Sequence, residues 1–588
     1  MRKPPASNLQ LRAILISTIK SNIGATLLLL LAVLVGAVIN IWPSMVLRAT
    51  IDGPLLAGTG NLWGYALLYL GAVVLIGVVD LLREYGATLL GQRLLLAVRS
   101  RMLSRLRALP MSYYLNVPAG ETISRLTADV DAVNRLFSAG LVSAGADLLK
   151  IVGFLVALFV LSPPLGFVAL ASLPAVFLVT NYFRRNIYEK QLVVRRKVSD
   201  INTYIQETYA GMKLIKTYGK EDYFSERFEP TLESHRLAMN ANSVYDAWFP
   251  CITQTVRAVV IATAIYLAAG QNFGPVALGL TLGTIAGAAD LFIRLFEPIE
   301  AISSEIQTIQ QALAGLNRIS QFFDHETESG ERFATASVWD GQNSEVRVEG
   351  VRFAYKDGED VLLDASLEVP TGSKVAIAGR TGSGKTTLMN LIAGLYPVKN
   401  GTITVGGVDP YNLSPSDRRR LIGIVPQTVH IFNGSIYENI TLRDASISVS
   451  QAEEAMRTVG LWDTVTELPS GMKTPLGEGG TKLSFGQSQL LSLARAVVTN
   501  PPLLLLDELT SGLDALTERT VLKAIRQVSA GRTIITISHR LSGIIDAETV
   551  HIMERGKIME SGSPEELARR EGWYAIYKRL EDRGWQIS

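Results

Sequence analysis

The sequence predicts a protein of two unlike parts: an all-α polytopic membrane domain with six transmembrane helices, followed by an α/β domain with a phosphate-binding loop. Three observations lead to this fold class. The first half contains apolar stretches of about 20 residues, the length needed to cross a bilayer. The second half alternates short apolar, strand-like runs with helical patterns. One Gly-rich segment of the second half has the spacing of a phosphate loop.

The composition agrees with a chain that is partly embedded in lipid. Apolar residues make up 48% of the 588 residues, too many for a soluble enzyme, and charged residues make up 19%, too many for a protein wholly within a membrane. The net charge of +2 gives no strongly basic face, so we exclude nucleic acid as a partner. The single cysteine, Cys251, lies in an apolar stretch, where we expect it to pack rather than react.

Six apolar stretches are long enough to span a membrane as helices. They are residues 23–47, 62–82, 139–161, 165–183, 248–269 and 276–296. Arginines are concentrated in the long segment between the second and third stretches, whereas the short hairpins carry almost no positive charge. The positive-inside rule therefore places the long loops and both termini in the cytoplasm. The N-terminal lead lacks a cleavage site after a brief apolar core, so we expect no removable signal peptide.

The two long loops are expected to be helical, because apolar residues recur in them at helical spacing. Each loop has a short break, at residues 111–120 and 208–218, that we interpret as a transverse helix.

After the sixth stretch, a polar and Gly-containing passage without periodicity indicates a linker. The predicted membrane domain thus covers residues 1–321, the linker 322–345 and the α/β domain 346–588.

A Gly-rich segment follows the strand-like run 375–378 and precedes a helical pattern. Its residues are Gly379, Arg380, Thr381, Gly382, Ser383, Gly384, Lys385, Thr386 and Thr387. The backbone N–H groups of such a loop cradle phosphates, Lys385 reaches the β- and γ-phosphates, and Thr386 ligates Mg²⁺. A plain connecting turn is the alternative, but the strand–loop–helix order favours the phosphate loop.

The apolar run 503–506 ends in two carboxylates, Asp507 and Glu508. Asp507 is suited to hold Mg²⁺ through water, and Glu508 is suited to polarise an attacking water. Adjacent acids after an apolar strand are, taken alone, usually a solvated strand end. Paired with a phosphate loop, they are expected to be catalytic groups.

The segment Leu483, Ser484, Phe485, Gly486 and Gln487 resembles the signature motif of the ATP-binding cassette (ABC) transporter family. Other positions resemble the rest of that family's ATPase domain, in the expected order. They are Tyr355 for the aromatic residue that stacks on adenine, Gln427 for the glutamine that links the γ-phosphate and Mg²⁺ to the membrane domain, residues 511–514 for the loop that crosses the dimer interface, and His539 for the histidine that contacts the γ-phosphate. The resemblance covers essentially the whole chain and implies a half-transporter of the exporter type.

The resemblance implies that ATP and Mg²⁺ are the cofactors and that two ATPase domains close head to tail. Each ATP then lies between the phosphate loop of one chain and the signature of the other. Ser484, Gly486, Gln487 and Asp514 are accordingly expected at the nucleotide interface, and Gln427 is expected to join Thr386 and Asp507 around Mg²⁺. A second half-transporter is the implied partner.

The resemblance also gives the two loop breaks a role. They are similar to the coupling helices that pass closure of the ATPase domains to the membrane domain, and residues 474–478 resemble the loop that touches such helices in exporters. Ordinary connecting turns are the alternative for both.

Phe485 departs from the family pattern, which usually has glycine there, and Ser488 replaces the common arginine. Because Glu508 is intact, this combination resembles a subunit of a heterodimer whose phosphate loop serves the hydrolysing site and whose signature completes a weaker one. A tolerated variant in a homodimer is the alternative. We favour the heterodimer.

Six ionisable residues fall within or at the edges of the predicted spans, where charges usually face a cavity or each other. They are Asp147, Lys150, Asp246, Arg257, Asp290 and Arg294. They are expected either to line a polar path or to pair and fix helix packing.

The predicted function is ATP-driven export across the cell membrane by alternating access, with the ATPase domain in the cytoplasm. Amphipathic drugs, other small molecules, lipids and peptides are the expected cargo classes. Two alternatives stay open on the sequence. One is a siderophore importer with an exporter-type fold, and the other is an ATP-gated channel or regulator without turnover.

Overall fold

The computed structural model describes residues 6–58, 60–269, 281–328, 339, 341, 343–356, 358–477, 479–509, 513–538 and 547–582. The chain packs as two units. The helical unit comprises Met1–Arg107 and Pro118–Glu326, and the α/β unit comprises Ala108–Val117 and Thr327–Ser588. The short segment Ala108–Val117 from the first long loop therefore packs with the α/β unit, far from it in sequence.

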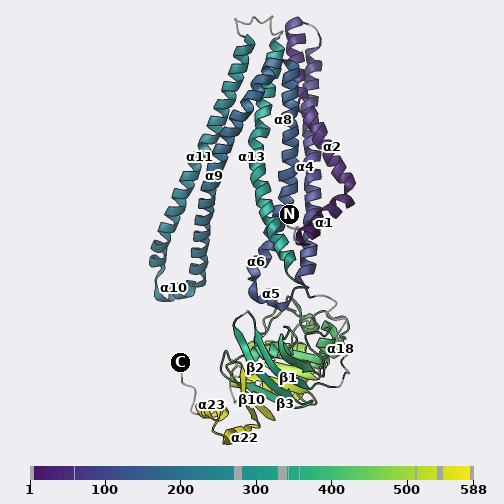
Figure 1. Ribbon diagram of the computed structural model, residues 1–588, viewed down its shortest axis with the longest axis vertical. Coiled ribbons are helices and arrows are strands. Elements are labelled where there is room, and N and C mark those ends of the chain that lie inside the picture. The colour runs from purple at the N-terminus through teal and green to yellow at the C-terminus, as the bar shows by residue number, and fades with distance from the viewer. Residues whose placement is uncertain are drawn as a thin grey trace. The chain divides into compact units, whose positions relative to one another are not determined.

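The helical unit consists of several long helices and a few short ones (Figure 1). They are α1 (Ala6–Ser21), α2 (Ile23–Ile39), α3 (Trp42–Thr50), α4 (Leu62–Leu106), α6 (Ala119–Ser124), α7 (Val130–Arg135), α8 (Val142–Leu161), α9 (Pro163–Ala210), α10 (Met212–Tyr218), α11 (Glu221–Ala269) and α13 (Leu282–Asp324), with π-helical turns at Ile51–Ala57, Arg125–Asp129 and Leu136–Leu141. Helices α9 and α11 run side by side as a long hairpin closed by α10.

Five stretches of the described residues are long and apolar enough to cross a membrane. They are Ile23–Ala57, Leu62–Leu106, Ala119–Leu161, Pro163–Ala210 and Glu221–Tyr266. The sixth predicted span, 276–296, begins outside the described residues, and its described part forms the start of α13. The helices extend well beyond the predicted spans, as the helical periodicity of the long loops predicts.

The helix boundaries follow from local chemistry. Asn61 caps α4 by accepting a hydrogen bond from the backbone N–H of Trp63, 3.0 Å away. Ser162 is extended between α8 and α9, and Pro163 begins α9 at a position where its missing N–H costs little. Gly219 ends α10 with a φ of 57°, the left-handed geometry that glycine adopts easily.

Close packing in the helical unit depends on small residues where helices cross. A Cβ atom at Gly283 would lie 2.4 Å from the carbonyl oxygen of Arg48, and one at Gly287 would lie 2.9 Å from that of Ser44. The two glycines are four residues apart on α13, so they form one face that α3 approaches closely.

The helical unit also has an apolar core, which joins α8, α9, α11 and α13 around buried side chains such as Phe154, Phe292 and Phe296.

A nine-stranded sheet organises the α/β unit, in the order β4-β1-β2-β11-β10-β3-β9-β8-β5. The strands are β1 (Val346–Ala354), β2 (Asp360–Val369), β3 (Lys374–Ala378), β4 (Asn400–Val405), β5 (Ile422–Val425), β8 (Leu503–Asp507), β9 (Thr533–Ser538), β10 (Thr549–Glu554) and β11 (Lys557–Gly562). The run β10-β3-β9-β8-β5 is parallel, which confirms the predicted parallel core. On one side it is extended by β11, which is antiparallel to β10, and then by β2, which is parallel to β11, and by β1 and β4, which continue with antiparallel pairs.

Helices cover this sheet (Figure 1). They are α15 (Lys385–Ile392), α16 (Pro415–Leu421), α17 (Ile436–Thr441), α18 (Val449–Thr458), α19 (Trp462–Thr466), α20 (Phe485–Val497), α21 (Ala515–Val528), α22 (Pro564–Arg569) and α23 (Trp573–Asp582). Apolar side chains of α15 pack in one core with β1 and β2, whereas those of α20 pack in another with α18 and α21. A small sheet pairs β6 (Gly434–Ser435) with β7 (Pro475–Leu476).

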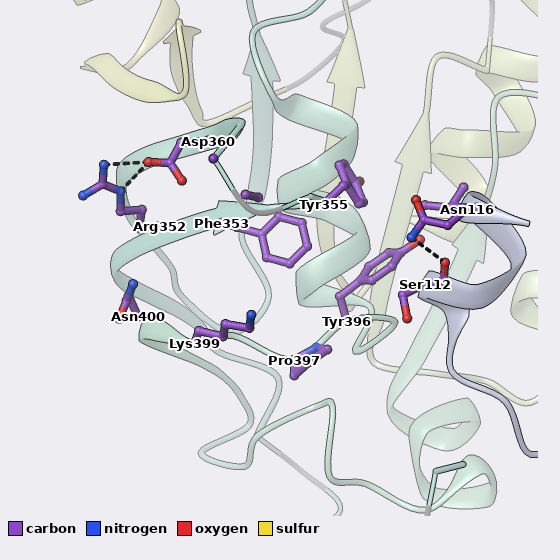
Figure 2. Close-up of a pocket in the computed structure, with 13 residues that line it drawn as sticks. Ser112, Asn116, Arg352, Phe353, Tyr355, Asp360, Tyr396, Pro397, Lys399 and Asn400 are labelled. Carbon is purple, nitrogen blue, oxygen red and sulfur yellow. Dashed lines mark hydrogen bonds and ion pairs between the residues drawn. The ribbon is translucent and has the colours of Figure 1, made fainter. Parts of the chain in front are cut away.

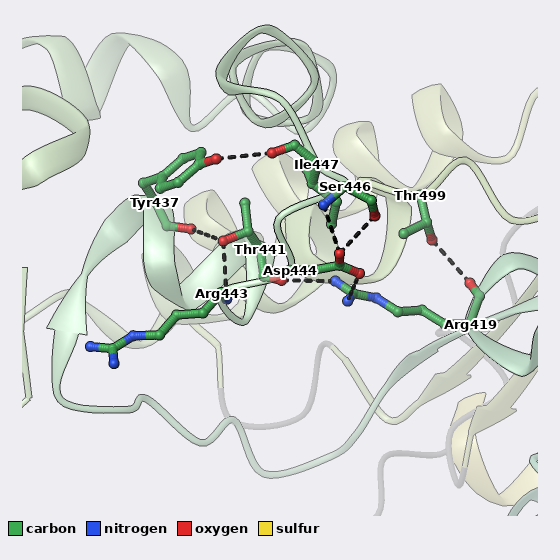
Figure 3. Close-up of polar contacts among 8 residues, drawn as sticks. All are labelled: Arg419, Tyr437, Thr441, Arg443, Asp444, Ser446, Ile447 and Thr499. Atoms are coloured by element: carbon green, nitrogen blue, oxygen red, sulfur yellow. Dashed lines mark hydrogen bonds and ion pairs between the residues drawn. The ribbon is translucent and has the colours of Figure 1, made fainter. Parts of the chain in front are cut away.

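The turn after α17 is held by side chains from distant segments (Figure 3). Leu442 and Arg443 adopt φ values of 53° and 60°, a conformation that is uncommon for residues other than glycine. Arg419 donates a 3.0 Å hydrogen bond to the carbonyl of Thr441 and forms a 2.8 Å ion pair with Asp444. These bonds fix the turn and tie it to α16.

Candidate nucleotide-binding site

The Gly-rich segment lies between β3 and α15, as the strand–loop–helix order predicts. Gly382 and Gly384 have φ values of 85° and 103°. Gly379 has no room for a side chain, because a Cβ atom there would lie 2.0 Å from the carbonyl oxygen of Met553. The loop therefore needs glycine both for its backbone angles and for its close approach to β10.

Lys385 is buried within this loop, only 6% exposed. Its ammonium donates hydrogen bonds to the carbonyls of Gly379, at 2.8 Å, and Arg380, at 2.9 Å. Burial lowers the pKa of Lys385, and the nearby carboxylates of Glu508 and Asp507 act in the opposite direction. The ammonium thus donates to neutral carbonyl groups of the loop, and a charged acceptor such as a phosphate oxygen would form a stronger hydrogen bond with it and replace them.

The loop also contains a polar atom whose hydrogen-bonding capacity is unused. The hydroxyl oxygen of Ser383 is buried and has no hydrogen-bond partner among the described residues. A buried hydroxyl without a partner is costly, and phosphate oxygens are strong acceptors. The loop therefore fits a bound polyphosphate.

Two carboxylates end the strand next to this loop, with Asp507 at the end of β8 and Glu508 just after it. Burial and the neighbouring charge of Glu508 together raise the pKa of Asp507 to about 6, against the opposing effect of Lys385. Glu508 has a φ of 47°, and its N–H donates a 3.1 Å hydrogen bond to the carbonyl of Ile537 on β9.

Gln427 meets Glu508 although the two are 81 residues apart in the sequence. The side-chain amide of Gln427 donates a 2.7 Å hydrogen bond to Oε2 of Glu508. The contact arises because β5 and β8 are neighbouring parallel strands and the two residues follow their carboxyl ends. The structure thus brings together Lys385, Gln427 and the adjacent pair Asp507 and Glu508 from three separate sequence segments.

Tyr355 lies in a cluster of aromatic rings rather than alone. Its hydroxyl is 3.2 Å from that of Thr387, and its ring packs edge-on against Phe353 and Tyr396. Desolvation raises the pKa of Tyr396 to about 12. This cluster forms one wall of a cavity of about 460 Å³ (Figure 2).

The other wall of this cavity includes α5 (Met111–Asn116), which belongs to the α/β unit. Figure 2 shows the ring of Tyr396 pointing toward Ser112 and Asn116 of α5. The sequence reasoning missed Tyr396, because it stands in a turn after α15 and carries no motif. It predicted a transverse helix at 111–120 that passes closure of the ATPase domains to the membrane domain, with residues 474–478 as the loop that touches such helices, but it did not predict that Tyr396 faces this helix. The second predicted break, 208–218, contains α10.

The signature-like segment forms the start of α20. Ser484 caps the helix, its hydroxyl accepting from the N–H of Gln487 at 3.2 Å while the Gln487 side chain accepts from the N–H of Ser484 at 2.8 Å. Phe485 is 52% exposed. Gly486 is buried, and a Cβ atom there would lie 2.1 Å from the side chain of Thr517. The helix therefore presents its N-terminus and the Phe485 ring at the surface of this chain.

The remaining predicted site residues are only partly described. Asp514 caps α21, accepting from the N–H groups of Leu516 and Thr517, and its hydrogen bond from the Thr517 hydroxyl lowers its pKa. His539 and residues 510–512 lie outside the described residues, as does Glu478 of the segment 474–478, in which Pro475 and Leu476 form β7.

The six ionisable residues predicted in or near the spans are engaged within the helical unit. The contacts are Lys150–Asp147 at 3.4 Å, Arg294–Asp290 at 2.9 Å, Arg257–Glu300 at 3.2 Å, and a 2.6 Å hydrogen bond from Asn242 to Asp246. Of these contacts, Arg257–Glu300 joins two helices, α11 and α13, and the other three each lie within one helix.

Comparisons with known proteins agree with this arrangement. The family model of the ABC transporter transmembrane region matches residues 23–285, and the model described as ABC transporter matches residues 362–511. A probable multidrug resistance ABC transporter ATP-binding/permease protein, YheH of Bacillus subtilis, is 30% identical over 87% of this chain and 76% of its own length. An ATP-dependent lipid A-core flippase of Thiobacillus denitrificans is 31% identical over 88% of each chain.

A bacterial Atm1-family ABC exporter solved with ATP bound has a similar fold, with a TM-score of 0.76 over 98% of this chain and all of the other, at 24% sequence identity. These relatives favour an exporter over the importer and the channel that the sequence left open. The chain belongs to the ATP-binding cassette transporter family, as a half-transporter of the exporter type that couples ATP hydrolysis to transport across a membrane.

Proposed function

We propose that this chain is one half of a dimeric exporter that moves amphipathic molecules out of the cell across the cell membrane by alternating access. The observation that carries the proposal is the hydrogen bond between Gln427 and Glu508, beside the buried Lys385 and Asp507. It links the strand end that holds the candidate catalytic base to the segment that, in this family, communicates with the membrane domain. Relatives named for multidrug resistance and for lipid A-core flipping support amphipathic cargo.

Within the ATP site we assign roles by chemistry. Glu508 is proposed to orient and polarise the attacking water, because its carboxylate lies beside Gln427 at the end of a parallel strand. Lys385 and the loop N–H groups are proposed to hold the β- and γ-phosphates, with Ser383 donating to a phosphate oxygen. His539 is proposed to contact the γ-phosphate, and Tyr355 to stack on adenine.

The donor set also fits Mg²⁺. Thr386, Gln427 and Asp507 supply oxygen atoms, the ligands that this cation prefers. When bound, Mg²⁺ supplies positive charge that neutralises the phosphates. Burial and Glu508 hold the pKa of Asp507 high, so a cation beside it would favour the ionised carboxylate that the site needs.

We further propose that the partner is a different half-transporter. Helix α15 after the phosphate loop and the signature helix α20 pack in two different cores of one chain, which supports a site completed by a second chain. Phe485 is exposed at the start of α20, where a second chain's phosphates would meet helix N–H groups. Its ring would crowd that position, while Glu508 of this chain remains available to the other site.

Transport in inside-out vesicles tests the function. Vesicles from the native host carrying the chain and its partner should accumulate an amphipathic substrate when ATP is added, and vesicles carrying Glu508→Gln should not. ATP-dependent loss of substrate from the vesicles would instead indicate import and overturn the proposed direction. Equal accumulation with and without Glu508 would overturn the assignment of the catalytic base.

A further inference from the structure

The helical unit contains a polar cavity of about 290 Å³ that the ATPase chemistry does not use. It lies where α4, α8 and α13 meet the C-terminal end of α2. Its charged lining consists of three basic and three acidic side chains: Arg83, Asp147, Lys150, Arg294, Glu297 and Glu305. Such a concentration of ionisable groups among apolar helices is costly and usually marks a functional site.

The three basic side chains are already compensated by carboxylates. The pairs are Arg83–Asp80 at 3.6 Å, Lys150–Asp147 at 3.4 Å and Arg294–Asp290 at 2.9 Å. The two residues of each pair are three or four positions apart on the same helix, so the helix itself holds them together. The positive charge of the lining is therefore neutralised by the protein itself.

The other two acidic side chains of the lining, Glu305 and Glu297, form no ion pair among the described residues, although the charges of Arg83 and Lys150 act on Glu305 from a greater distance. Glu305 is 7% exposed, and its Oε2 atom has no hydrogen-bond partner among the described residues. Glu297 is exposed and forms no ion pair within the described part of the chain. A buried carboxylate oxygen without a donor is costly, so the site is built to receive a positively charged or hydrogen-donating group.

The surroundings favour an organic cation over a metal ion. Among the described residues, no group of three or more His, Cys, Asp or Glu side chains is arranged to hold a metal. The lining also includes the ring of Phe154 and the apolar side chains of Pro298 and Ala301. An aromatic ring that lines the same cavity as a carboxylate suits an alkylated ammonium group, which is weakly hydrated and attracted to ring faces.

We propose that this cavity binds the cationic group of the transported molecule, with Glu305 as its counter-charge, and that amphipathic organic cations are therefore a substrate class of this exporter. Calling the bound molecule a transported substrate rests on the proposed export function. The binding test does not, because it is carried out without ATP.

The test compares two small probes of similar shape and opposite charge, benzyltrimethylammonium and benzylsulfonate. Saturation-transfer NMR titrations use the full-length protein in lipid nanodiscs. The wild type is expected to bind the cation more tightly than the anion. Glu305→Gln keeps the shape of the side chain and removes its charge, so it should weaken cation binding about ten-fold and leave anion binding unchanged.

The matched control is Glu189→Gln, which removes an exposed carboxylate of α9 that pairs with Arg185. It should bind both probes like the wild type. Equal affinity of the wild type for the two probes, or cation binding that Glu305→Gln leaves intact, would overturn the inference. If Glu305→Gln does not elute as the folded protein, Glu297→Gln at the exposed edge of the cavity replaces it, with a smaller loss of cation affinity expected and an unchanged affinity counting against the site.

The two proposals fail separately. Cation binding that depends on Glu305 in a protein that performs no ATP-driven transport would leave the cavity assignment standing and overturn the proposed function. Normal ATP-driven transport without charge-selective binding would do the reverse.

Discussion

At the scale of single residues, the site depends on a backbone geometry that glutamate rarely adopts. Glu508 has a φ of 47°, and its N–H bonds to the carbonyl of Ile537. A non-glycine residue in this region costs of order 1–3 kcal/mol and persists where the surrounding structure demands it. Here the strained position lets the carboxylate turn toward Gln427 instead of continuing the line of β8. The strain and the contact occur at the residue that we propose as the catalytic base.

The first prediction concerns this carboxylate. Glu508→Gln should lower ATP turnover about 100-fold or more, because it removes the group that polarises water. ATP affinity should stay near the wild-type value, since the phosphate loop is untouched. Steady-state ATPase assays and nucleotide-binding titrations check the two halves. Glu453→Gln, on the exposed face of α18, is the control for losing one carboxylate, and near-normal turnover in Glu508→Gln would contradict the assignment.

The second prediction concerns His551, which is buried on β10. Its Nδ1 lies 2.7 Å from the Ser561 hydroxyl, its Nε2 has no partner among the described residues, and burial lowers its pKa to about 4. In the unfolded chain a histidine titrates near 6.5. Between these values the unfolded chain binds a proton that the folded chain does not, so stability falls as the pH falls, by at most about 3 kcal/mol.

Thermal unfolding followed by tryptophan fluorescence at about pH 7 and about pH 5 measures this loss. His551→Gln cannot titrate and should show a smaller drop between the two pH values than the wild type. His430→Gln removes an exposed histidine of the same unit and should behave like the wild type. An equal drop in wild type and His551→Gln would show that other groups cause the acid sensitivity.

At the scale of elements, the sequence predicted what contiguous segments can encode. The phosphate loop, the strand before Asp507 and the helices of the long loops each carry their signal within a few dozen residues, and the structure contains them. The strand order could not be predicted in this way, because β5 and β8 are neighbours although 77 residues separate the end of β5 from the start of β8. The Gln427–Glu508 contact depends on this strand order, so no local sequence pattern predicts it.

The same limit explains the other features that sequence reasoning missed. The residues of the pairs Lys150–Asp147 and Arg294–Asp290 are three and four positions apart, each pair on its own helix. Their spacing alone was therefore enough to predict that they pair. The unpartnered state of Glu305, by contrast, depends on what three other helices bring near it. The packing of α5 beside Tyr396 likewise joins segments about 280 residues apart.

The third prediction concerns the crossing of α3 and α13. Gly283→Ala should destabilise this contact by about 1–3 kcal/mol, because the new methyl group would lie 2.4 Å from a backbone carbonyl that cannot move freely. Gly71→Ala on α4 is the matched control, since nothing lies within 4 Å of a Cβ atom there. Thermal unfolding of the detergent-solubilised protein compares them. Equal melting temperatures for the two variants would contradict the close crossing.

At the scale of the whole molecule, the assembly is defined by what one chain lacks. The signature helix α20 begins with an exposed Phe485 directly after its cap, Ser484. Helix α15, which follows the phosphate loop, packs in the other core of the unit. Under the proposed dimer, ATP hydrolysis depends on a second ATPase domain, and the identity of that domain decides whether both sites or only one contain a phenylalanine at this position.

The last prediction tests that asymmetry. In a heterodimer the signature of this chain completes the partner's site, so Phe485→Gly should barely change hydrolysis at the site that uses Glu508, and should raise total turnover only if the partner has a competent glutamate. In a homodimer both sites contain Phe485, and the same change should alter the main activity directly, because one misplaced backbone donor can cost about 3–4 kcal/mol in a transition state. The chain purified alone should hydrolyse ATP poorly and regain activity when its partner is added. Full activity of the chain by itself, altered by Phe485→Gly, would refute the heterodimer and leave the membership of the family unchanged.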